Sequence, residues 1–209
     1  MNYDKAINDM IEFHLKGRDV SDIRVLKVME IIPRQDFVPA SLKSSAYDDN
    51  PLPVGYGQTI SQPYIVAIMT ELLELKGDEK VLEVGAGSGY QAAILSKLAK
   101  KVIGVERVKE LAERTKVFLK KKGYKNVTLI HGDGTKGYAK QAPYDAIIIT
   151  AATPKVPEVL FEQLADNGRL VAPVGPSYHQ ELIRYKKVKG KLEKDYFGGC
   201  IFVPLIFDD

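Results

Sequence analysis

The sequence is poor in the residues that build disulfides, metal sites and membrane spans. It contains one cysteine, Cys200, no tryptophan and three histidines among 209 residues. A single cysteine cannot form an internal disulfide, and no metal-ligand spacing links it to the histidines. No apolar run approaches the roughly 20 residues that cross a bilayer, and the polar N-terminus lacks a signal-peptide core. We therefore expect a cytoplasmic protein without a metal or a membrane partner.

The chain also lacks an excess of charge of either sign, because it contains 30 basic and 27 acidic residues. The lysines are spread over predicted helices and are not clustered with aromatic residues, so a nucleic-acid partner is not indicated. The length suits one sizeable core and is too short for two full domains of ordinary size. We expect a monomer with a single domain, 1–209, made of a helical N-terminal extension (1–76) and a core (77–209).

The N-terminal third reads as three helices separated by an irregular segment. Apolar periodicity predicts helices over 4–16, from an N-cap at Ser21 to residue 32, and from Pro63 to about residue 75. The segment 33–62 between them is rich in proline and glycine. A loop of this length in a compact domain is usually functional, so we interpret it as a lid or a binding wall.

From Lys80 onward, strands and helices alternate, which is the signature of a parallel sheet. A lysine-rich turn at 189–191 predicts a hairpin-like, antiparallel ending. We therefore predict an α/β fold with a doubly wound, mostly parallel seven-stranded sheet and one antiparallel strand near the C-terminus. The predicted strands lie near 80–84, 101–106, 127–131, 144–150, 168–174, 181–188 and 200–207, and the helices near 89–99, 108–122, 134–140 and 156–165.

The chain is organised around the stretch 81–90, where a short apolar run breaks into three glycines and resumes as a helical pattern. A strand, a glycine turn and a helix form a corner at which a ligand can approach the backbone. The glycines stand at 85, 87 and 89, whereas a dinucleotide fingerprint needs G-x-G-x-x-G and position 90 is tyrosine. With Glu83 two residues ahead, the pattern resembles the first motif of S-adenosylmethionine-dependent methyltransferases. The alternative is a glycine-rich turn that binds nothing.

Two further carboxylates follow predicted strands, where ligands bind in such sheets. Glu106 comes about 20 residues after the first glycine and could accept hydrogen bonds from both ribose hydroxyls. Its alternative role is an exposed charge that begins the next helix. Asp133 could accept a hydrogen bond from an adenine amino group, or it could cap the following short helix, and both roles are compatible. We interpret His131 as structural.

Taken together, these residues are similar to the cofactor site of class I methyltransferases. Such enzymes use S-adenosylmethionine, and the protein mainly orients the reactants and excludes water. The predicted cofactor site comprises Glu83, Gly85, Ala86, Gly87, Gly89, Tyr90, Glu106, Arg107, Asp133 and Gly134.

Several longer stretches closely resemble the protein-L-isoaspartate O-methyltransferase family over nearly the whole chain. The most specific is Gly57-Gln58-Thr59-Ile60-Ser61-Gln62-Pro63, within a match over 52–64. Other matches lie at 33–39, 46–47, 144–152, 168–175 and 202–205. The resemblance implies a variant of the methyltransferase sheet in which the last two strands exchange places.

The resemblance also implies a reaction, namely methyl transfer to the free α-carboxylate of isoaspartyl residues in damaged proteins and peptides. The ester would collapse to a succinimide, whose hydrolysis partly restores an aspartyl linkage. Ser61 would be the active-site residue, and the substrate-binding residues would be Thr59, Ile60, Gln62 and Val174. An α-carboxylate with a pKa of about 3.5 is already ionised at neutral pH, so the reaction needs no general base. Without the resemblance, Ser61 would be interpreted as the N-cap of the helix at Pro63.

Other functions were weighed against this one. A methyltransferase of the same fold could act on RNA or on a small molecule, but the stretch 150–154 (TAATP) offers no Asn-Pro-Pro-Tyr-like catalytic loop. A cofactor-binding protein without catalysis is a second alternative. A dehydrogenase fits worst, because the third dinucleotide glycine is missing.

Overall fold

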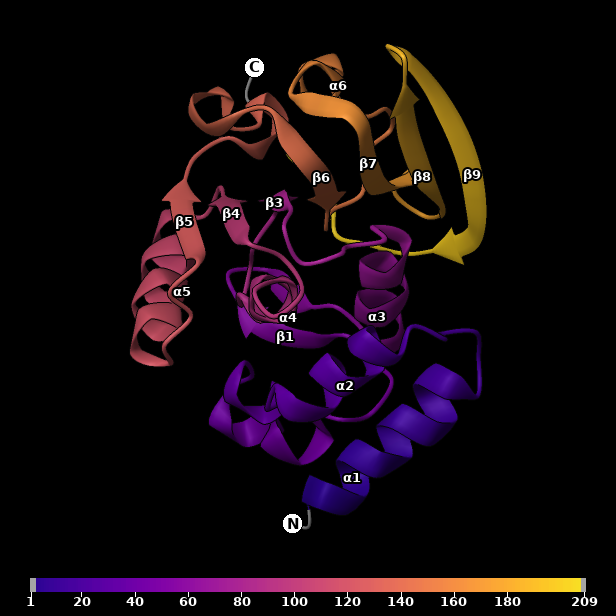
Figure 1. Cartoon of the computed structure of the whole chain (residues 1–209). Coiled ribbons are helices and arrows are strands. Elements are labelled where there is room, and N and C mark those ends of the chain that lie inside the picture. The colour runs from indigo at the N-terminus through magenta and orange to yellow at the C-terminus, as the bar shows by residue number, and fades with distance from the viewer. Residues whose placement is uncertain (1–2, 208–209) are drawn as a thin grey trace.

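A computed structural model describes residues 3–207 and places a seven-stranded sheet at the centre of the molecule (Figure 1). The strand order is β5-β4-β3-β6-β7-β8-β9. The first five strands of this order run parallel, and β8 is antiparallel to both of its neighbours. This arrangement confirms the predicted fold. At the β9 edge, the spatial order of the strands β7, β8 and β9 is the same as their order in the sequence. The strands are β3 (Lys80–Val84), β4 (Lys101–Glu106), β5 (Val127–His131), β6 (Tyr144–Ile149), β7 (Leu164–Val174), β8 (Gln180–Val188) and β9 (Lys191–Cys200).

The two faces of the sheet are buried in separate apolar clusters because side chains alternate along each strand. On β6, Ala146 and Ile148 belong to one cluster, whereas Ile147 and Ile149 belong to the other. On β3, Val81 lies in the first cluster and Leu82 in the second. A sheet with both faces buried needs helices on both sides, as a doubly wound fold provides.

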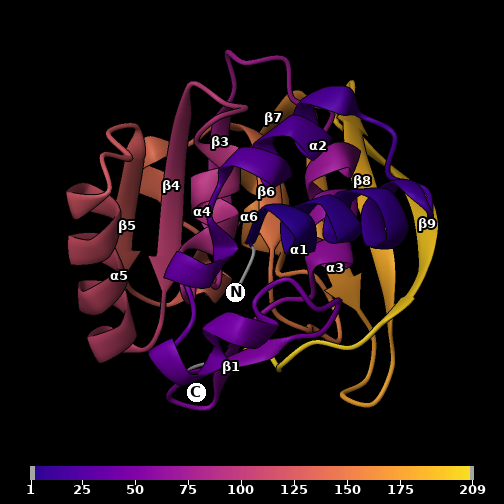
Figure 2. The same ribbon diagram turned by 90° about the horizontal axis from the view of Figure 1, so that it is seen from below.

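Helices cover both faces unequally (Figure 1). The short helix α6 lies over one face, and α4 with the N-terminal helices lies over the other. Seen from below, α5 runs along the β5 edge and β9 forms the opposite edge (Figure 2). The helices are α1 (Tyr3–Asp9), which continues as a π-helix (Met10–Lys16), α2 (Ile23–Ile31), α3 (Pro63–Leu72), α4 (Tyr90–Leu95), α5 (Lys109–Lys121) and α6 (Glu158–Glu162).

The irregular segment after α2 contains more structure than the sequence predicted. Two 3-10 helices, Arg34–Asp36 and Ala40–Ser45, precede a small antiparallel hairpin of β1 (Leu52–Gly55) and β2 (Gln58–Ile60). The hairpin leads directly into α3. The segment is therefore ordered, and its hairpin lies at the carboxyl end of the sheet, where Gln58 and Thr59 lie near Val84 and Glu106. Its role as a lid or a binding wall stays a prediction.

Several predicted boundaries are wrong. The N-cap of α2 is Asp22, whose side chain accepts a hydrogen bond from the Arg24 amide, whereas Ser21 bonds to Glu71. The predicted helix at 134–140 is two 3-10 turns, Gly134–Lys136 and Ala139–Gln141, and the helix predicted at 156–165 shrinks to α6.

The last predicted strand is also displaced. The chain pairs with β8 over Lys191–Cys200, and residues 201–207 lie outside any strand. The reason is the two-residue turn between Val188 and Lys191, whose central residues Lys189 and Gly190 both have positive φ. Such a turn starts the return strand immediately.

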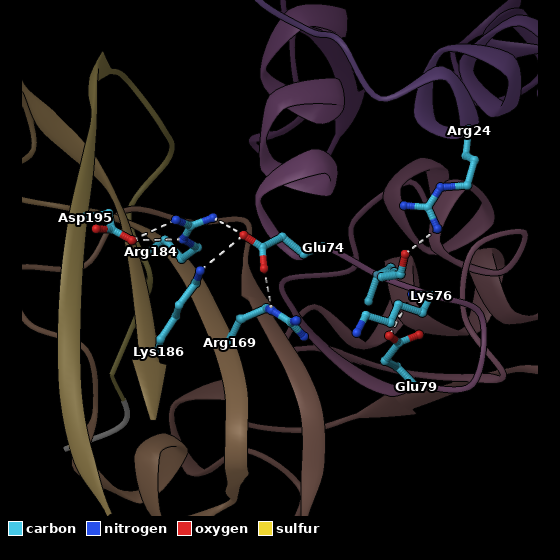
Figure 3. A network of polar contacts seen from close by, with 9 residues as sticks. Arg24, Glu74, Lys76, Glu79, Arg169, Arg184, Lys186 and Asp195 are labelled. Carbon is cyan, nitrogen blue, oxygen red and sulfur yellow. Dashed lines mark hydrogen bonds and ion pairs between the residues drawn. The ribbon is translucent and has the colours of Figure 1, made fainter. Parts of the chain in front are cut away.

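The connection between α3 and β3 is fastened by a cluster of charges (Figure 3). Glu74 accepts hydrogen bonds from Arg184 at 2.7 Å, from Lys186 at 3.2 Å and from Arg169 at 3.1 Å. Arg184 also pairs with Asp195 on β9 at 2.7 Å. The end of the helical extension is thereby tied to β7, β8 and β9 at once.

The N-terminal helices share one continuous apolar core with the sheet, reaching from Met10 to Leu182. The division into an extension and a core stays a prediction, and its residues 1–2 and 208–209 lie outside the described part of the chain. Between residues 3 and 207, no helix has both the length and the apolar character needed to cross a membrane.

Candidate active site

The glycine turn after β3 has the backbone that only glycines adopt readily. Gly85, Gly87 and Gly89 have φ values of +90°, +52° and +83°. Gly89 is also the residue from which α4 begins, and a Cβ atom there would lie 2.6 Å from the Thr115 side chain on α5. Thr115 in turn donates a hydrogen bond to the Gly87 carbonyl at 2.8 Å. The turn is therefore held closely against α5.

Glu106 ends β4 and is buried, so its alternative role as an exposed charge is wrong. Its carboxylate accepts hydrogen bonds from the amide of Gly87 at 2.8 Å and from the amide of Val108 at 2.9 Å. One side chain thus connects the glycine turn to the segment that begins α5. Each carboxylate oxygen retains further lone pairs for a ligand. The ribose role stays a prediction.

Glu83 is the most unusual residue of the corner. It lies on the β3 face that carries Val81, is fully buried, and neither carboxylate oxygen has a hydrogen-bond partner among residues 3–207. Burial, with a smaller contribution from the nearby Glu106 charge, raises the pKa of the Glu83 carboxyl well above its usual range. A buried acid with both oxygens unpaired is costly unless a ligand pairs with it.

Asp133 caps the 3-10 turn Gly134–Lys136, which confirms one of its two predicted roles. It accepts hydrogen bonds from the amide of Thr135 at 2.9 Å and from its hydroxyl at 2.6 Å, and it pairs with Lys136 at 3.1 Å. Burial opposes ionisation, but the bonds from Thr135 and Lys136 prevail and lower the pKa of Asp133. At Gly134 a Cβ atom would lie 2.6 Å from Val84, so only glycine lets this turn approach β3.

The predicted acceptor residues lie on the hairpin and on the turn that leads from it into α3. Ser61 is partly buried, and its hydroxyl has no hydrogen-bond partner within the described chain. The N-cap of α3 is Gln62, so the N-cap role considered for Ser61 is wrong. The side chain of Gln62 is held by Asp49 at 2.6 Å. The hairpin itself is fastened to α5, because Arg114 donates to the Val54 carbonyl at 2.7 Å.

Two adjoining hollows lie at this end of the sheet. The larger, which we call the glycine hollow, has a volume of about 100 Å³ and is lined by Gln58, Thr59, Val84, Gly85, Gly87, Val105, Glu106, Arg107, Val108, Gly134, Thr150, Ala151 and residues 203–206. The smaller, which we call the serine hollow, has a volume of about 30 Å³ and is lined by Thr59, Ile60, Ser61, Val66, Glu83, Gly85, Ala86, Gly87, Ser88, Tyr90, Gln91 and Thr150.

Most of the predicted site residues therefore meet at the two hollows, and they divide between them. The carboxylate of Glu106 faces the glycine hollow, and Glu83 and Ser61 share the serine hollow. Thr59, Gly85, Gly87 and Thr150 line both hollows, so the two spaces meet at the glycine turn. Asp133 is adjacent to Gly134 but does not itself line either hollow.

Gln62 and Gly89, like Asp133, line neither hollow, and two further predicted residues, Tyr90 and Val174, contact other parts of the molecule. The ring of Tyr90 packs 5.2 Å from that of Phe37 and beneath the Arg34 guanidinium, inside the N-terminal core. Val174 ends β7 beside Thr153 and lines neither hollow. The roles of both residues toward a ligand stay predictions.

The sequence reasoning missed two contributors to the site. Thr150 follows β6 directly, and its hydroxyl lies 2.6 Å and 2.9 Å from the carbonyls of Gly85 and Val84. Its place at the end of a strand was a usable signal. The tail 203–206 gave no such signal, because it reaches the glycine hollow by pairing with Ala152 through two backbone hydrogen bonds of 2.8 and 2.7 Å.

The residues of the two hollows fit S-adenosylmethionine chemically. The unpaired Glu83 carboxyl suits a ligand ammonium group, Glu106 suits hydroxyl donors, and the positive-φ glycines leave room beside the backbone. The enclosed volumes are below the roughly 300–1,000 Å³ of ordinary ligand pockets. We therefore expect the tail to lie further out when a ligand of this size is bound, since the lining residues Val84, Val105 and Glu106 belong to strands of the central sheet.

Comparison with known proteins shows which family the chain belongs to. The family model of protein-L-isoaspartate(D-aspartate) O-methyltransferases matches residues 5–208. The chain is 52% identical over 198 residues to a protein-L-isoaspartate O-methyltransferase of Methanoculleus marisnigri, covering 95% of this chain and 90% of that protein. It is 49% identical over 206 residues to another from Syntrophobacter fumaroxidans, covering 99% and 96%.

Solved structures agree as well. One protein-L-isoaspartate O-methyltransferase superposes with a TM-score of 0.86 at 31% identity, covering 95% of this chain and 65% of that one. A Plasmodium falciparum protein described as a member of the same family, in complex with S-adenosyl-L-homocysteine, gives a TM-score of 0.83 at 26% identity and covers 99% of both chains. The chain belongs to the protein-L-isoaspartate O-methyltransferase family.

Proposed function

We propose that this chain methylates the free α-carboxylate of isoaspartyl residues in damaged proteins and peptides, with S-adenosylmethionine as the methyl donor. The observation that carries the proposal is the serine hollow, where the unpaired hydroxyl of Ser61 and the unpaired carboxyl of Glu83 meet beside the glycine turn. One group suits the acceptor and the other suits the cofactor. Family membership supports the same activity.

The acceptor chemistry suits these side chains. An α-carboxylate with a pKa of about 3.5 is ionised at neutral pH, so no group of the protein needs to remove a proton from it. In agreement, the described residues that line the two hollows include no histidine and no cysteine. A hydroxyl such as that of Ser61 can donate one hydrogen bond to the carboxylate and orient it without neutralising it.

The cofactor would be held by the carboxylates and glycines of the corner. Glu83 would pair with an ammonium group, Glu106 with ribose hydroxyls, and Asp133 with an adenine amino group. When bound, S-adenosylmethionine supplies a methyl group on a positively charged sulfur, and this charge attracts an anionic acceptor. The chain contributes orientation and the exclusion of water, which are the main sources of rate in such a transfer.

The biological setting follows from this activity. The methyl ester would collapse to a succinimide, and hydrolysis would restore part of the aspartyl linkages, so the partners are proteins and peptides that carry isoaspartyl residues. A monomeric state and a cytoplasmic location stay predictions.

A matched peptide pair tests the proposal. Transfer of labelled methyl from S-adenosylmethionine should occur to an isoaspartyl peptide and not to the aspartyl peptide of the same sequence, and the label should be released by base. Binding of S-adenosyl-L-homocysteine without transfer to either peptide would contradict the proposed substrate and favour an RNA or small-molecule acceptor.

A further inference from the structure

The turn that carries Ser61 begins α3 without a cap of its own. Gln62 occupies the N-cap position, but its side chain makes no capping hydrogen bond. Pro63 follows as the first helical residue and has no N–H group to offer. The first amide that needs an acceptor is therefore that of Tyr64, and the local sequence provides none.

Asp49, from the loop before the hairpin, supplies the missing acceptor. One oxygen accepts a hydrogen bond from the Tyr64 amide at 3.1 Å, and the other accepts from the Gln62 side chain at 2.6 Å. Arg18 pairs with the second oxygen at 3.2 Å and balances its charge. The Asp49 side chain is only 16% exposed. A carboxylate here is also favoured by the positive end of the helix dipole.

The loop that carries Asp49 is itself anchored near the glycine turn. Arg34 is fully buried and donates to the carbonyl of Ala46 at 2.7 Å and to that of Asn50 at 3.4 Å. Its guanidinium carbon lies 5.0 Å from the centre of the Tyr90 ring, and Tyr90 directly follows the glycine turn. Contacts thus run from the cofactor corner through Arg34 to the loop that carries Asp49.

We propose that Asp49 is the positioning residue of the acceptor turn, holding Gln62 in place and thereby keeping the adjacent Ser61 against the serine hollow. The inference rests on the proposed function, because it takes these two residues as the acceptor contacts. Asp49 binds Gln62 and Tyr64 on either side of Pro63, so both flanks of the turn are fixed while the Ser61 hydroxyl stays free for substrate. Its action is indirect, since Asp49 lines neither hollow.

Asp48 provides a matched control for the test. It is the adjacent carboxylate, it is exposed, and its side chain makes none of the contacts described for Asp49. Asp48→Asn and Asp49→Asn change the net charge equally, one position apart. In Asp49→Asn the carbonyl oxygen can still cap Tyr64, but the new amide cannot accept from Gln62 and cannot pair with Arg18.

The experiment measures kcat and KM for an isoaspartyl peptide, the Kd for S-adenosyl-L-homocysteine and the midpoint of thermal unfolding in the wild type and both variants. We expect Asp49→Asn to lower kcat/KM about tenfold or more, because small misplacements of binding groups are costly. In Asp49→Asn, the Kd for S-adenosyl-L-homocysteine should stay within about twofold of the wild-type value. Asp48→Asn should resemble the wild type in every measurement.

Arg18→Gln is a second test, to be used if Asp49→Asn does not fold. It keeps the hydrogen bonds of Asp49 to Gln62 and Tyr64 and removes only the ion pair, so it should lower kcat/KM about two- to fivefold.

Three outcomes would overturn the inference. Equal kcat/KM in the Asp48 and Asp49 variants would refute it, and so would a parallel loss of cofactor affinity, stability and activity in Asp49→Asn, which a purely structural cap predicts. No transfer to the isoaspartyl peptide by the wild type would refute the proposed function and this inference with it. Transfer by the wild type separates the first two outcomes from the third.

Discussion

The cofactor corner and the acceptor turn meet at the same hollows but are held in different ways. The corner takes its shape from its own positive-φ glycines, and the side chains of Glu106, Thr115 and Thr150 bind it from 19, 28 and 65 positions away. The hairpin before the acceptor turn is held by Arg114, which lies 60 positions from Val54. The shape of the cofactor side is therefore set by its own glycines, whereas the acceptor side is placed by side chains from other segments, Arg114 and Asp49. Mutations should separate the two sides accordingly.

The largest effect on the cofactor side should come from Glu106→Ala. The substitution leaves the amides of Gly87 and Val108 without their acceptor, and each unpaired buried group costs about 1–3 kcal/mol. We expect the Kd for S-adenosyl-L-homocysteine, measured by calorimetry, to rise about 100-fold. Glu106→Gln, which can still accept one of the two bonds, should show a smaller rise. Unchanged affinity in the alanine variant would rule out the ribose role.

Ser61→Ala should act on the acceptor side alone. The Ser61 hydroxyl has no partner within residues 3–207, so its loss should disturb neither the fold nor the glycine turn. A hydrogen bond to a charged acceptor is worth about 1.5–3 kcal/mol, so kcat/KM for an isoaspartyl peptide should fall roughly 10- to 100-fold. Cofactor affinity should stay within about twofold. If cofactor affinity and turnover fell equally, the two sides would not be separable at this residue.

Glu83 lies between the two sides, and the pH dependence of stability in Glu83→Gln tests whether its carboxyl is protonated in the folded protein. The pKa of Glu83 is raised by burial, so the folded protein keeps a proton that the unfolded chain releases above pH 4.5. Wild-type stability therefore falls as pH rises from 4.5 toward the folded pKa, and glutamine removes this loss. We expect the variant to unfold about 3 °C higher than the wild type at pH 7, with the difference shrinking toward pH 4.5, in thermal scans without ligand. A constant difference across this range would contradict a neutral Glu83.

Glu74→Gln should affect stability alone, with the opposite pH trend and no change at either side of the site. Although burial raises its pKa, the bonds and charges of Lys186, Arg184 and Arg169 prevail and lower it. Its contribution is present above pH 4.5 and is lost as pH falls through the folded pKa. The side chain is 41% exposed, so we expect a loss of only about 1 kcal/mol at pH 7, or about 2–4 °C. A changed kcat/KM would instead show that the charge cluster around Glu74 affects the two hollows.

The same contrast explains what could be predicted from the sequence. The strand, turn and helix around Gly85–Gly89 are dictated by local patterns, and Glu106 was found because ligand-binding residues follow strands. Asp49 and Arg114 gave no such signal, because neither follows a strand of the central sheet and each binds a partner in a different element. The hairpin that Arg114 holds was likewise read only as irregular chain.

The C-terminal strand was placed wrongly for a physical reason. An apolar run over 200–207 was read as a strand, but β9 is an edge strand whose residues are nearly all exposed. In its first half, Lys191, Glu193, Lys194 and Asp195 carry charge in place of an apolar alternation. Charged edge strands resist pairing with other chains. The same charged residues remove the apolar alternation by which a strand is predicted from the sequence.

The tail 203–206 makes occupancy of the site visible without any turnover. The amide of Leu205 donates to the carbonyl of Ala152, and the amide of Ala152 donates to that of Val203. If the tail lies further out when a ligand is bound, both hydrogen bonds open, and these two amides should exchange their hydrogens with solvent faster in the complex. Hydrogen exchange at Ala152 and Leu205 would then report binding even in variants that no longer transfer a methyl group.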